Sequence, residues 1–392
     1  MTRSTLPLAL LAPLALAMLL SSPTRAHAQA TDAAPPNEHE PEASPQRFEA
    51  PSGAPAGSSA HTVALTPGLE VFARYALTAR ETADGRTWDH AFDVPRVHAA
   101  LSARYDGATA RVVLEGVRST TSGALVGVAT DSVLLRLREA SVGYRAFDDA
   151  LDLQLGLVPL LTIPALEGAW GLRAIASTPL EESNLAAPAD LGARATLRLP
   201  ARLGWVGGTV SSGEGYTSRE LNRGKNTEVA AELHALAPVA PALGPLALFV
   251  SGVYGSQGVA SSRAHRVTAG LLWRGDFRET GRTDAAFSAG ALVTLAWGVD
   301  DVGAREALLW ELFARGEPVR RLLLGARLVH LVRERSAPDD RVTTLIGTVG
   351  YRLAKPLELY LALTRAIPTS AARAALPGSD LWDLALTARF VL

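Results

Sequence analysis

The stretch VGYRAFDDALDLQLGL, residues 142–157, decides the fold. Its second half alternates apolar side chains with polar residues or glycine: Leu151, Asp152, Leu153, Gln154, Leu155, Gly156 and Leu157. Because successive side chains of a strand point to opposite faces of its sheet, this order predicts a strand with one apolar and one polar face. Residues 349–363, VGYRLAKPLELYLAL, repeat the same order of Tyr, Arg, short turn and alternating strand.

The same alternation runs through the chain from about residue 61 to its end. Stretches of about ten residues are separated by clusters of Gly, Pro, Asp and Ser, which is typical of barrel strands. Sixteen strands are predicted, at residues 68–80, 93–105, 108–118, 132–145, 151–158, 188–199, 201–211, 226–235, 246–255, 265–274, 284–297, 305–315, 320–333, 341–352, 357–365 and 381–392.

The lengths of the connections favour a closed barrel. Even-numbered connections are mostly short, as at Asp106-Gly107 and residues 353–356, whereas odd-numbered ones tend to be longer, as at 159–187 and 366–380. Short turns on one side and long loops on the other are typical of outer-membrane barrels. We therefore predict an all-β fold, a transmembrane antiparallel up-and-down β-barrel of about 16 strands. A soluble β-sandwich also alternates, so periodicity alone does not exclude it.

Aromatic residues gather at one end of the predicted strands. Strands that run towards the short turns end in Tyr105, Tyr144, Trp273, Tyr351 and Phe390, all on the apolar face. Tyr and Trp prefer the boundary between membrane and water, so these residues predict an aromatic girdle. The alternative is that they cap the core of a soluble protein.

The N-terminal residues have the features of a secretory signal peptide. A single early basic residue, Arg3, precedes an apolar run at 6–20 and the small-residue sequence Ala-His-Ala at 26–28. A retained membrane anchor is the alternative, but the run is short for a spanning helix and a proline follows it. The next residues are rich in Pro, Ala, Ser and Glu, which predicts a disordered leader. The expected parts of the chain are a signal peptide at 1–28, a leader at 29–61 and the barrel at 62–392.

The composition excludes several kinds of site and partner. The 392 residues have 20% charged side chains and a formal net charge of -1, with no sign of nucleic-acid binding. The absence of Cys excludes disulfides, thiolate metal sites, a Cys nucleophile and a lipid-modified N-terminal Cys. Export without Cys fits a Gram-negative envelope, so we expect the protein in the outer membrane. Prolines break the one long apolar run of the mature chain, at 235–253, as a helix.

Charged side chains on the polar face are expected to line an enclosed pore, because Arg or Lys on the lipid face costs roughly 2–4 kcal/mol at the midplane. The arginines in this phase are Arg74, Arg96, Arg104, Arg111, Arg136, Arg138, Arg194, Arg198, Arg327 and Arg389. The carboxylates are Glu70, Glu115, Asp152, Glu228, Glu232, Glu311, Glu358 and Asp383. Arginine grips phosphate or carboxylate with a planar fork, so such a wall could favour anions. The alternative is solvated wall charge with weak selectivity.

The long connection 159–187 is a candidate to fold into the lumen and narrow it, because an apolar external loop would sit in water. Trp170, Leu172 and Ile175 would then pack inside the wall. Arg173, Glu181 and Glu182 would face the solute. The alternative is an ordinary surface loop. Residues 213–226 are expected to form a polar external loop.

An enzyme is not expected, and neither is a cofactor or a metal. The eight His residues are scattered, and no two have metal-ligand spacing on one element. No Gly-x-Ser-x-Gly motif is present, although spacing alone does not exclude a Ser-His hydrolase. His98, His234 and His330 are interpreted as wall residues.

Three stretches resemble phosphate-selective porins of the O/P type, an outer-membrane family. LRLREASVGYRAFDDALDLQLGLVPLL, residues 135–161, resembles the family's hairpin that leads to a constriction loop. DLGARATLRLP at 190–200 and GTVSSGEGYTSRELNRGKN at 208–226 resemble its DxG strand and a following loop. The resemblance implies a sixteen-stranded barrel, commonly a homotrimer, that passes anions such as phosphate. The chain departs from the family in having only two lysines and in ending at Leu392 rather than at an aromatic residue.

Taken together, these patterns predict an outer-membrane, porin-like channel for small hydrophilic solutes, with outer-membrane lipid as its surroundings. A structural barrel with a plugged lumen is the nearest alternative. An outer-membrane hydrolase is the alternative from the enzyme class.

Overall fold

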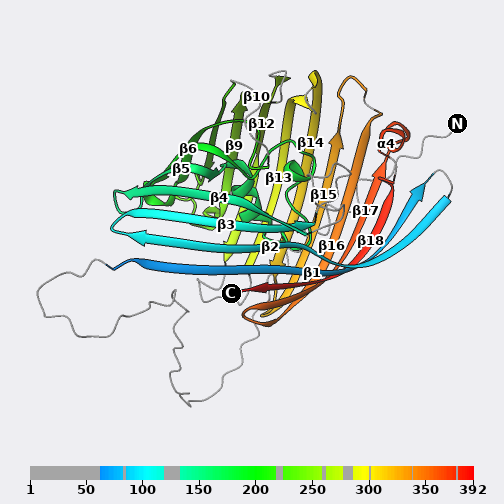
Figure 1. The fold of residues 1–392 in the computed structure, drawn as a ribbon, viewed down its shortest axis with the longest axis horizontal. Coiled ribbons are helices and arrows are strands. Elements are labelled where there is room, and N and C mark those ends of the chain that lie inside the picture. The colour runs from blue at the N-terminus through cyan, green and yellow to red at the C-terminus, as the bar shows by residue number, and fades with distance from the viewer. Residues whose placement is uncertain are drawn as a thin grey trace, which may run out of the picture. The chain divides into compact units, whose positions relative to one another are not determined.

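The computed structural model describes residues 62–82, 85–118, 133–217, 224–257, 262–276, 286–299, 302–337, 339–376 and 378–392. These residues form one closed antiparallel barrel of sixteen strands, seen in Figure 1 as a single wrapped sheet. The predicted all-β barrel is therefore confirmed. The predicted signal peptide and leader lie outside the described residues.

The barrel strands follow one another around the sheet in chain order. Their bounds are β1 (Ala64–Thr82), β2 (Gly85–Tyr105), β3 (Ala108–Arg118), β4 (Val133–Ala146), β5 (Leu151–Pro159), β6 (Ala189–Leu199), β7 (Gly204–Ser211), β8 (Asn226–Leu233), β9 (Leu246–Tyr254), β12 (His265–Asp276), β13 (Ala286–Val299), β14 (Val302–Glu317), β15 (Leu322–Val332), β16 (Arg341–Ala354), β17 (Leu357–Pro368) and β18 (Leu381–Val391). β1 and β18 close the barrel, with Glu70 opposite Val391 and Arg80 opposite Leu381. Between β9 and β12, β10 (Ser256–Gln257) and β11 (Ser262–Arg263) form a small hairpin.

The alternation in sequence becomes an outer and an inner face. On β18, Leu384 and Leu386 point outwards and are 43% and 51% exposed, whereas Asp383 and Thr387 point inwards and are 7% and 1% exposed. Large apolar side chains are exposed in the same way on most of the other barrel strands. An exterior of this kind is stable only in an apolar surrounding, so the face suits hydrocarbon rather than water.

Aromatic side chains lie on the outer face at the short-turn end. Tyr105, Tyr144 and Tyr351 are 44%, 52% and 47% exposed there. Trp273 and Phe390 share this face, because each is paired across the ladder with outward-facing neighbours. This is the arrangement that the aromatic pattern predicts.

The β1–β2 hairpin is longer than predicted. The ladder continues beyond residues 68–80 and 93–105 until Thr82 lies opposite Gly85. A strand alternates strictly only where one of its faces meets apolar and the other polar surroundings. The extension lacks this alternation, so the sequence pattern did not predict it. A β-bulge between Phe72 and Arg74 shifts the register of this ladder.

Three short helices lie in the described parts of the connections. α2 (Thr162–Trp170) and α3 (Pro179–Glu182) lie between β5 and β6, and α4 (Ser370–Ala375) lies between β17 and β18. Single turns of 3-10 helix occur at Pro200–Arg202 and Pro241–Leu243. No helix in the described ranges is both long and apolar enough to cross a membrane.

Candidate functional site

The connection between β5 and β6 lies against the inner wall of the barrel. Ile163, Leu166 and Trp170 of α2 are buried in one apolar cluster with inward-facing residues of β9 and β12 to β15. The Trp170 ring packs edge-on against Phe313 of β14, with 5.9 Å between ring centroids. Its Nε1 donates to the Ala176 carbonyl at 3.1 Å. Burial of these apolar side chains holds the segment inside the barrel.

Polar side chains of β8 and β13 fix this inner segment to the wall. Glu228 of β8 accepts the backbone N–H groups of Leu161 and Thr162, both at 2.8 Å, at the start of α2. Ser288 of β13 donates to the Ala169 carbonyl at 2.7 Å. Such contacts satisfy backbone groups at the helix ends that would otherwise lack partners.

Further arginines of the wall donate to carbonyl groups of the same segment. Arg274 of β12 donates to the Ala165 carbonyl at 3.0 Å, and Arg266 donates to the Leu185 carbonyl at 2.8 Å. Arg327 of β15 donates to the Ser177 carbonyl at 2.5 Å. The inner segment is therefore attached along its whole length.

Across the lumen, a cluster of polar side chains surrounds Glu115 of β3. This carboxylate is fully buried and accepts from Arg136 Nε at 2.8 Å and from Arg138 at 3.0 Å. It also forms an ion pair with Arg96, whose Nε lies 3.2 Å away. Tyr216, in the connection after β7, donates its hydroxyl to the same group at 2.8 Å. Three guanidinium groups around one carboxylate leave a local excess of positive charge.

His98 of β2 links this cluster to the seam of the barrel. Its Nε2 lies 3.1 Å from Glu115, and its Nδ1 lies 3.4 Å from Glu70. Glu70 accepts from Arg389 of β18 at 2.7 Å, and Arg389 also donates to Glu358 at 3.0 Å. The chain of contacts therefore runs across the β1–β18 closure.

In several ion pairs of the wall, the guanidinium side chain is more exposed than its carboxylate partner. In five of them, the guanidinium side chain is 29–35% exposed and the carboxylate side chain 10% or less. The pairs are Arg74–Asp383, Arg136–Glu115, Arg274–Glu232, Arg352–Glu317 and Arg389–Glu358. The longer arginine stem carries its charge further from the backbone than an Asp or Glu stem does. In these pairs the guanidinium groups are therefore closer to the enclosed water than their carboxylate partners are.

The inner segment presents charged groups to the opposite wall. Glu181 accepts from Arg173 at 3.0 Å and from Arg96 of β2 at 3.3 Å, which connects the segment to the Glu115 cluster. Arg173 also contacts Glu167. Arg173 and Glu181 are only 12% and 14% exposed, so little of either side chain reaches the lumen. Glu182 is exposed to the enclosed water.

The pKa of Glu182 is expected to make the pore sensitive to pH. Glu182 lies among protein atoms inside the barrel, and the resulting loss of solvation, with the neighbouring charges of Glu181 and Glu311, raises its pKa to about 7 against the opposing charge of Arg327. Below that pH the group is neutral, and above it the lumen gains a negative charge. We expect the ratio of anion to cation permeability to be higher at pH 6 than at pH 8, measured as reversal potential. Glu182→Gln should remove this dependence, and its persistence in the variant would assign the effect to another group.

The structure places the predicted pore-lining residues in different settings. Arg104 lies at the short-turn rim and makes two hydrogen bonds to Asp149, at 2.8 and 3.0 Å, and Arg198 is exposed at the end of β6. Arg111 pairs with Glu139 at 2.9 Å and is half-exposed. Arg194 donates to the Pro159 carbonyl at 3.2 Å.

Other predicted residues face inwards without reaching the enclosed water. Arg327 is 1% exposed, because it lies beneath the inner segment, pairs with Glu311 at 2.7 Å and stacks on Trp170. It therefore anchors the segment and does not line the lumen. Glu115 and Arg138 are likewise covered by their partners. Asp152 faces inwards and accepts from Gln154 at 3.0 Å.

The pattern missed several inward-facing residues. Arg315 of β14 points inwards beside Gly171 of the inner segment and has no ion-pair partner in the described part of the chain. It shares the odd-numbered phase of Glu311 and Glu317, which is the signal that could have identified it. Arg274 and Arg352 could have been identified in the same way, because each occupies an inward-facing position in the alternation of its strand. Tyr216 lies in a loop, where no periodicity applies.

The described residues contain no group of three or more His, Cys, Asp or Glu that could hold a metal ion. The other predicted wall histidines are engaged elsewhere. His330 stacks on Trp310 on the outer face, and His234 contacts the Gly244 carbonyl at 2.8 Å.

Comparisons with known proteins support the fold at low sequence identity. No family model matches the chain, and no curated protein sequence matches it. The structure is similar to an anion-selective porin from Comamonas acidovorans, at 14% identity and a TM-score of 0.57, over 84% of this chain and 100% of that one. It is also similar to OmpF of Salmonella typhi in complex with daunomycin, at 10% identity and a TM-score of 0.56, over 84% and 97% of the chains.

A third similar structure is the trimer form of OmpT, an outer membrane protein of Vibrio cholerae, at 14% identity and a TM-score of 0.52. The match covers 84% of this chain and 100% of that one. At these identities the likeness concerns the path of the backbone and not the side chains of the lumen. The chain therefore has the fold of a bacterial porin.

Proposed function

We propose that the protein is an outer-membrane channel through which small hydrophilic solutes diffuse, with a preference for anions of the phosphate type. The exposed apolar exterior and the porin fold support the membrane location. The charged interior supports a water-filled path, because ionised side chains facing an empty apolar lumen would be costly. A homotrimer, with surrounding outer-membrane lipid, is part of this proposal.

One observation carries the anion preference. Guanidinium groups of the wall are exposed to the lumen, and their carboxylate partners are buried behind them. A solute therefore passes a positive surface although the numbers of acidic and basic residues nearly balance, at 39 and 38. Charged rings of this kind set selectivity in pores, and guanidinium groups bind phosphate oxygens in a planar fork.

The inner segment supports a narrowed path. It occupies the side of the lumen next to β12 to β15 and reaches the opposite wall through the contact of Glu181 with Arg96. We propose that solutes pass between Glu182 and the Glu115 cluster.

Planar bilayer recordings test the proposal. The full-length mature protein should give stepwise conductance. In a KCl gradient, the sign of its reversal potential should show that chloride passes more readily than potassium. A barrel that inserts and gives no steps is plugged, and a cation-preferring pore contradicts the anion preference. A hydrolase would turn over lipid or ester substrates without conductance.

A further inference from the structure

A shallow groove of about 500 Å³ lies on the outer face of β8, β9, β12 and β13, at their long-loop ends. Gly252 of β9 forms its floor, and a side chain built there would meet no atom within 4 Å. The exposed side chains of Val229 and Val267 stand on either side, each opposite Gly252 across its ladder. The groove is therefore one side chain deep, apolar and open to the surroundings of the barrel.

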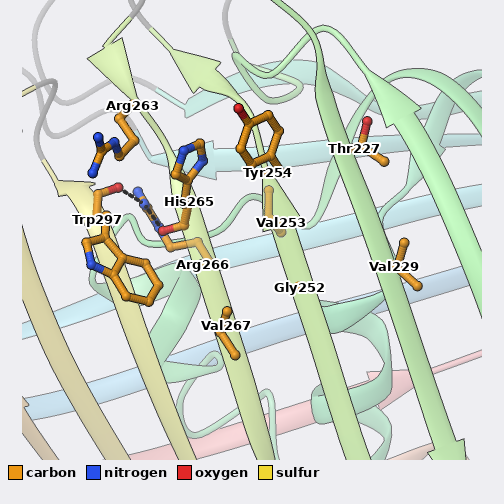
Figure 2. Close-up of a pocket in the computed structure, with 10 residues that line it drawn as sticks. All are labelled: Thr227, Val229, Gly252, Val253, Tyr254, Arg263, His265, Arg266, Val267 and Trp297. Carbon is orange, nitrogen blue, oxygen red and sulfur yellow. Dashed lines mark hydrogen bonds between the residues drawn. The ribbon is translucent and has the colours of Figure 1, made fainter.

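An aromatic row closes the groove on the loop side. Tyr254 and His265 stack with their ring centroids 4.3 Å apart, and Trp297 lies opposite His265 on β13. Figure 2 shows Arg263, His265 and Tyr254 side by side above the strands, with Trp297 next to Arg263. The rim is thus aromatic and basic, whereas the floor is apolar.

The rim carries several hydrogen-bond donors. The Arg263 guanidinium, the Tyr254 hydroxyl and the Trp297 Nε1 have no partner among the residues that the structure describes. His265 Nδ1 accepts the Gly255 N–H at 3.2 Å, which leaves the proton on Nε2 as another donor. Four donors without an acidic partner, directly above an apolar groove, complement an acceptor that carries negative charge and an apolar chain.

Arg263 is held in place by its backbone. Gly298 approaches the Arg263 carbonyl so closely, at a φ of 71°, that a side chain at residue 298 would overlap it. The β10–β11 pairing of Ser256 with Arg263 fixes the other side. The backbone that carries this side chain is therefore fixed at the rim of the groove.

We infer that the groove binds a phosphorylated membrane lipid, with one acyl chain along Gly252 and the phosphate at Arg263. The lipid must be the occupant, rather than a second copy of the chain, because the groove accepts only a single narrow chain and its rim offers charge to an anion. The inference rests on the proposed membrane location and not on transport.

Native mass spectrometry of the detergent-purified full chain tests this inference. Dioleoylphosphatidylglycerol and dioleoylglycerol, which share acyl chains and differ in the phosphate head, are titrated separately. We expect tight binding of the first phosphatidylglycerol, weakened roughly tenfold by Arg263→Gln or by Gly252→Leu. Dioleoylglycerol should bind the wild type as weakly as the variants bind phosphatidylglycerol.

Matched controls make the result specific to the groove. Gly347→Leu adds the same side chain at an open outer glycine of β16, and Arg86→Gln removes an exposed charge from the β1–β2 hairpin. Both should bind phosphatidylglycerol like the wild type. The inference would be overturned if the wild type and both groove variants bound phosphatidylglycerol equally, or if the wild type bound the two lipids equally. Dissociation of an oligomer by Gly252→Leu would also overturn it. Single-channel conductance of the groove variants should stay unchanged, so loss of the lipid site and loss of the channel are distinguishable.

Discussion

Replacing Arg136 and Arg138 together by Ala is expected to lower the ratio of anion to cation permeability on the order of fivefold. Glu115 then keeps only Arg96, His98 and Tyr216 as partners, so the local excess of positive charge disappears. The measurement is the reversal potential in a KCl gradient, compared with the wild type. Single-channel conductance reports in the same recordings whether the variant still forms a pore.

Two further variants make this expectation specific. Arg86→Ala removes one charge from the exposed β1–β2 hairpin and should leave the reversal potential unchanged. Glu115→Gln removes the buried carboxylate and should shift the potential in the opposite direction from the double variant. An unchanged potential in the Arg136→Ala, Arg138→Ala variant would remove this cluster from the selectivity mechanism.

Replacing residues 161–187 by a short Gly-Ser linker is expected to increase single-channel conductance by about twofold or more, because conduction follows the open cross-section of the pore. The ends of the segment are already close, since Pro159 lies opposite Ala189 and the Leu160 N–H donates to the Pro188 carbonyl at 3.0 Å. The β5–β6 ladder can therefore close the barrel without the segment.

Trp170→Ala is the milder form of the same experiment. It removes a buried ring that packs on Phe313 and Arg327, and a large-to-small change of this kind costs about 3–5 kcal/mol in a packed core. We expect an intact barrel with a loosened inner segment and noisier current. A linker variant with wild-type conductance would show that the segment does not narrow the path.

The strands could be predicted because a barrel wall imposes one rule on all of them. A side chain at every second position meets an apolar exterior, so residues such as Leu384 and Asp383 reveal their faces without knowledge of their neighbours. For residues 159–187 the sequence left two alternatives, an inner segment and a surface loop, and the inner one is found because Trp170 and Leu172 are buried inside the barrel. The longer β1–β2 ladder could not be read in this way, because it extends beyond the region where the rule applies.

Partners within the lumen could not be predicted from one strand at a time. Glu115 receives groups from β2, β4 and the loop after β7, so its setting depends on the register of several ladders. Arg327 has the phase of a pore-lining residue, but the inner segment covers it. Alternation assigns a side chain to the inner face and says nothing about what lies above it.

Side chains of the barrel strands are proposed to alternate between enclosed water and the apolar exterior, and single cysteines test this alternation directly. Because the natural chain has no Cys, single cysteines can be placed on β4 without background, at inward-facing Arg136 and at its outward-facing neighbour Leu135, which is 71% exposed. We expect a negatively charged, water-soluble thiol reagent to modify Arg136→Cys and change the current through the reconstituted pore. Leu135→Cys should resist that reagent and react only with a membrane-soluble one. Equal modification of the two positions by the charged reagent would contradict the account.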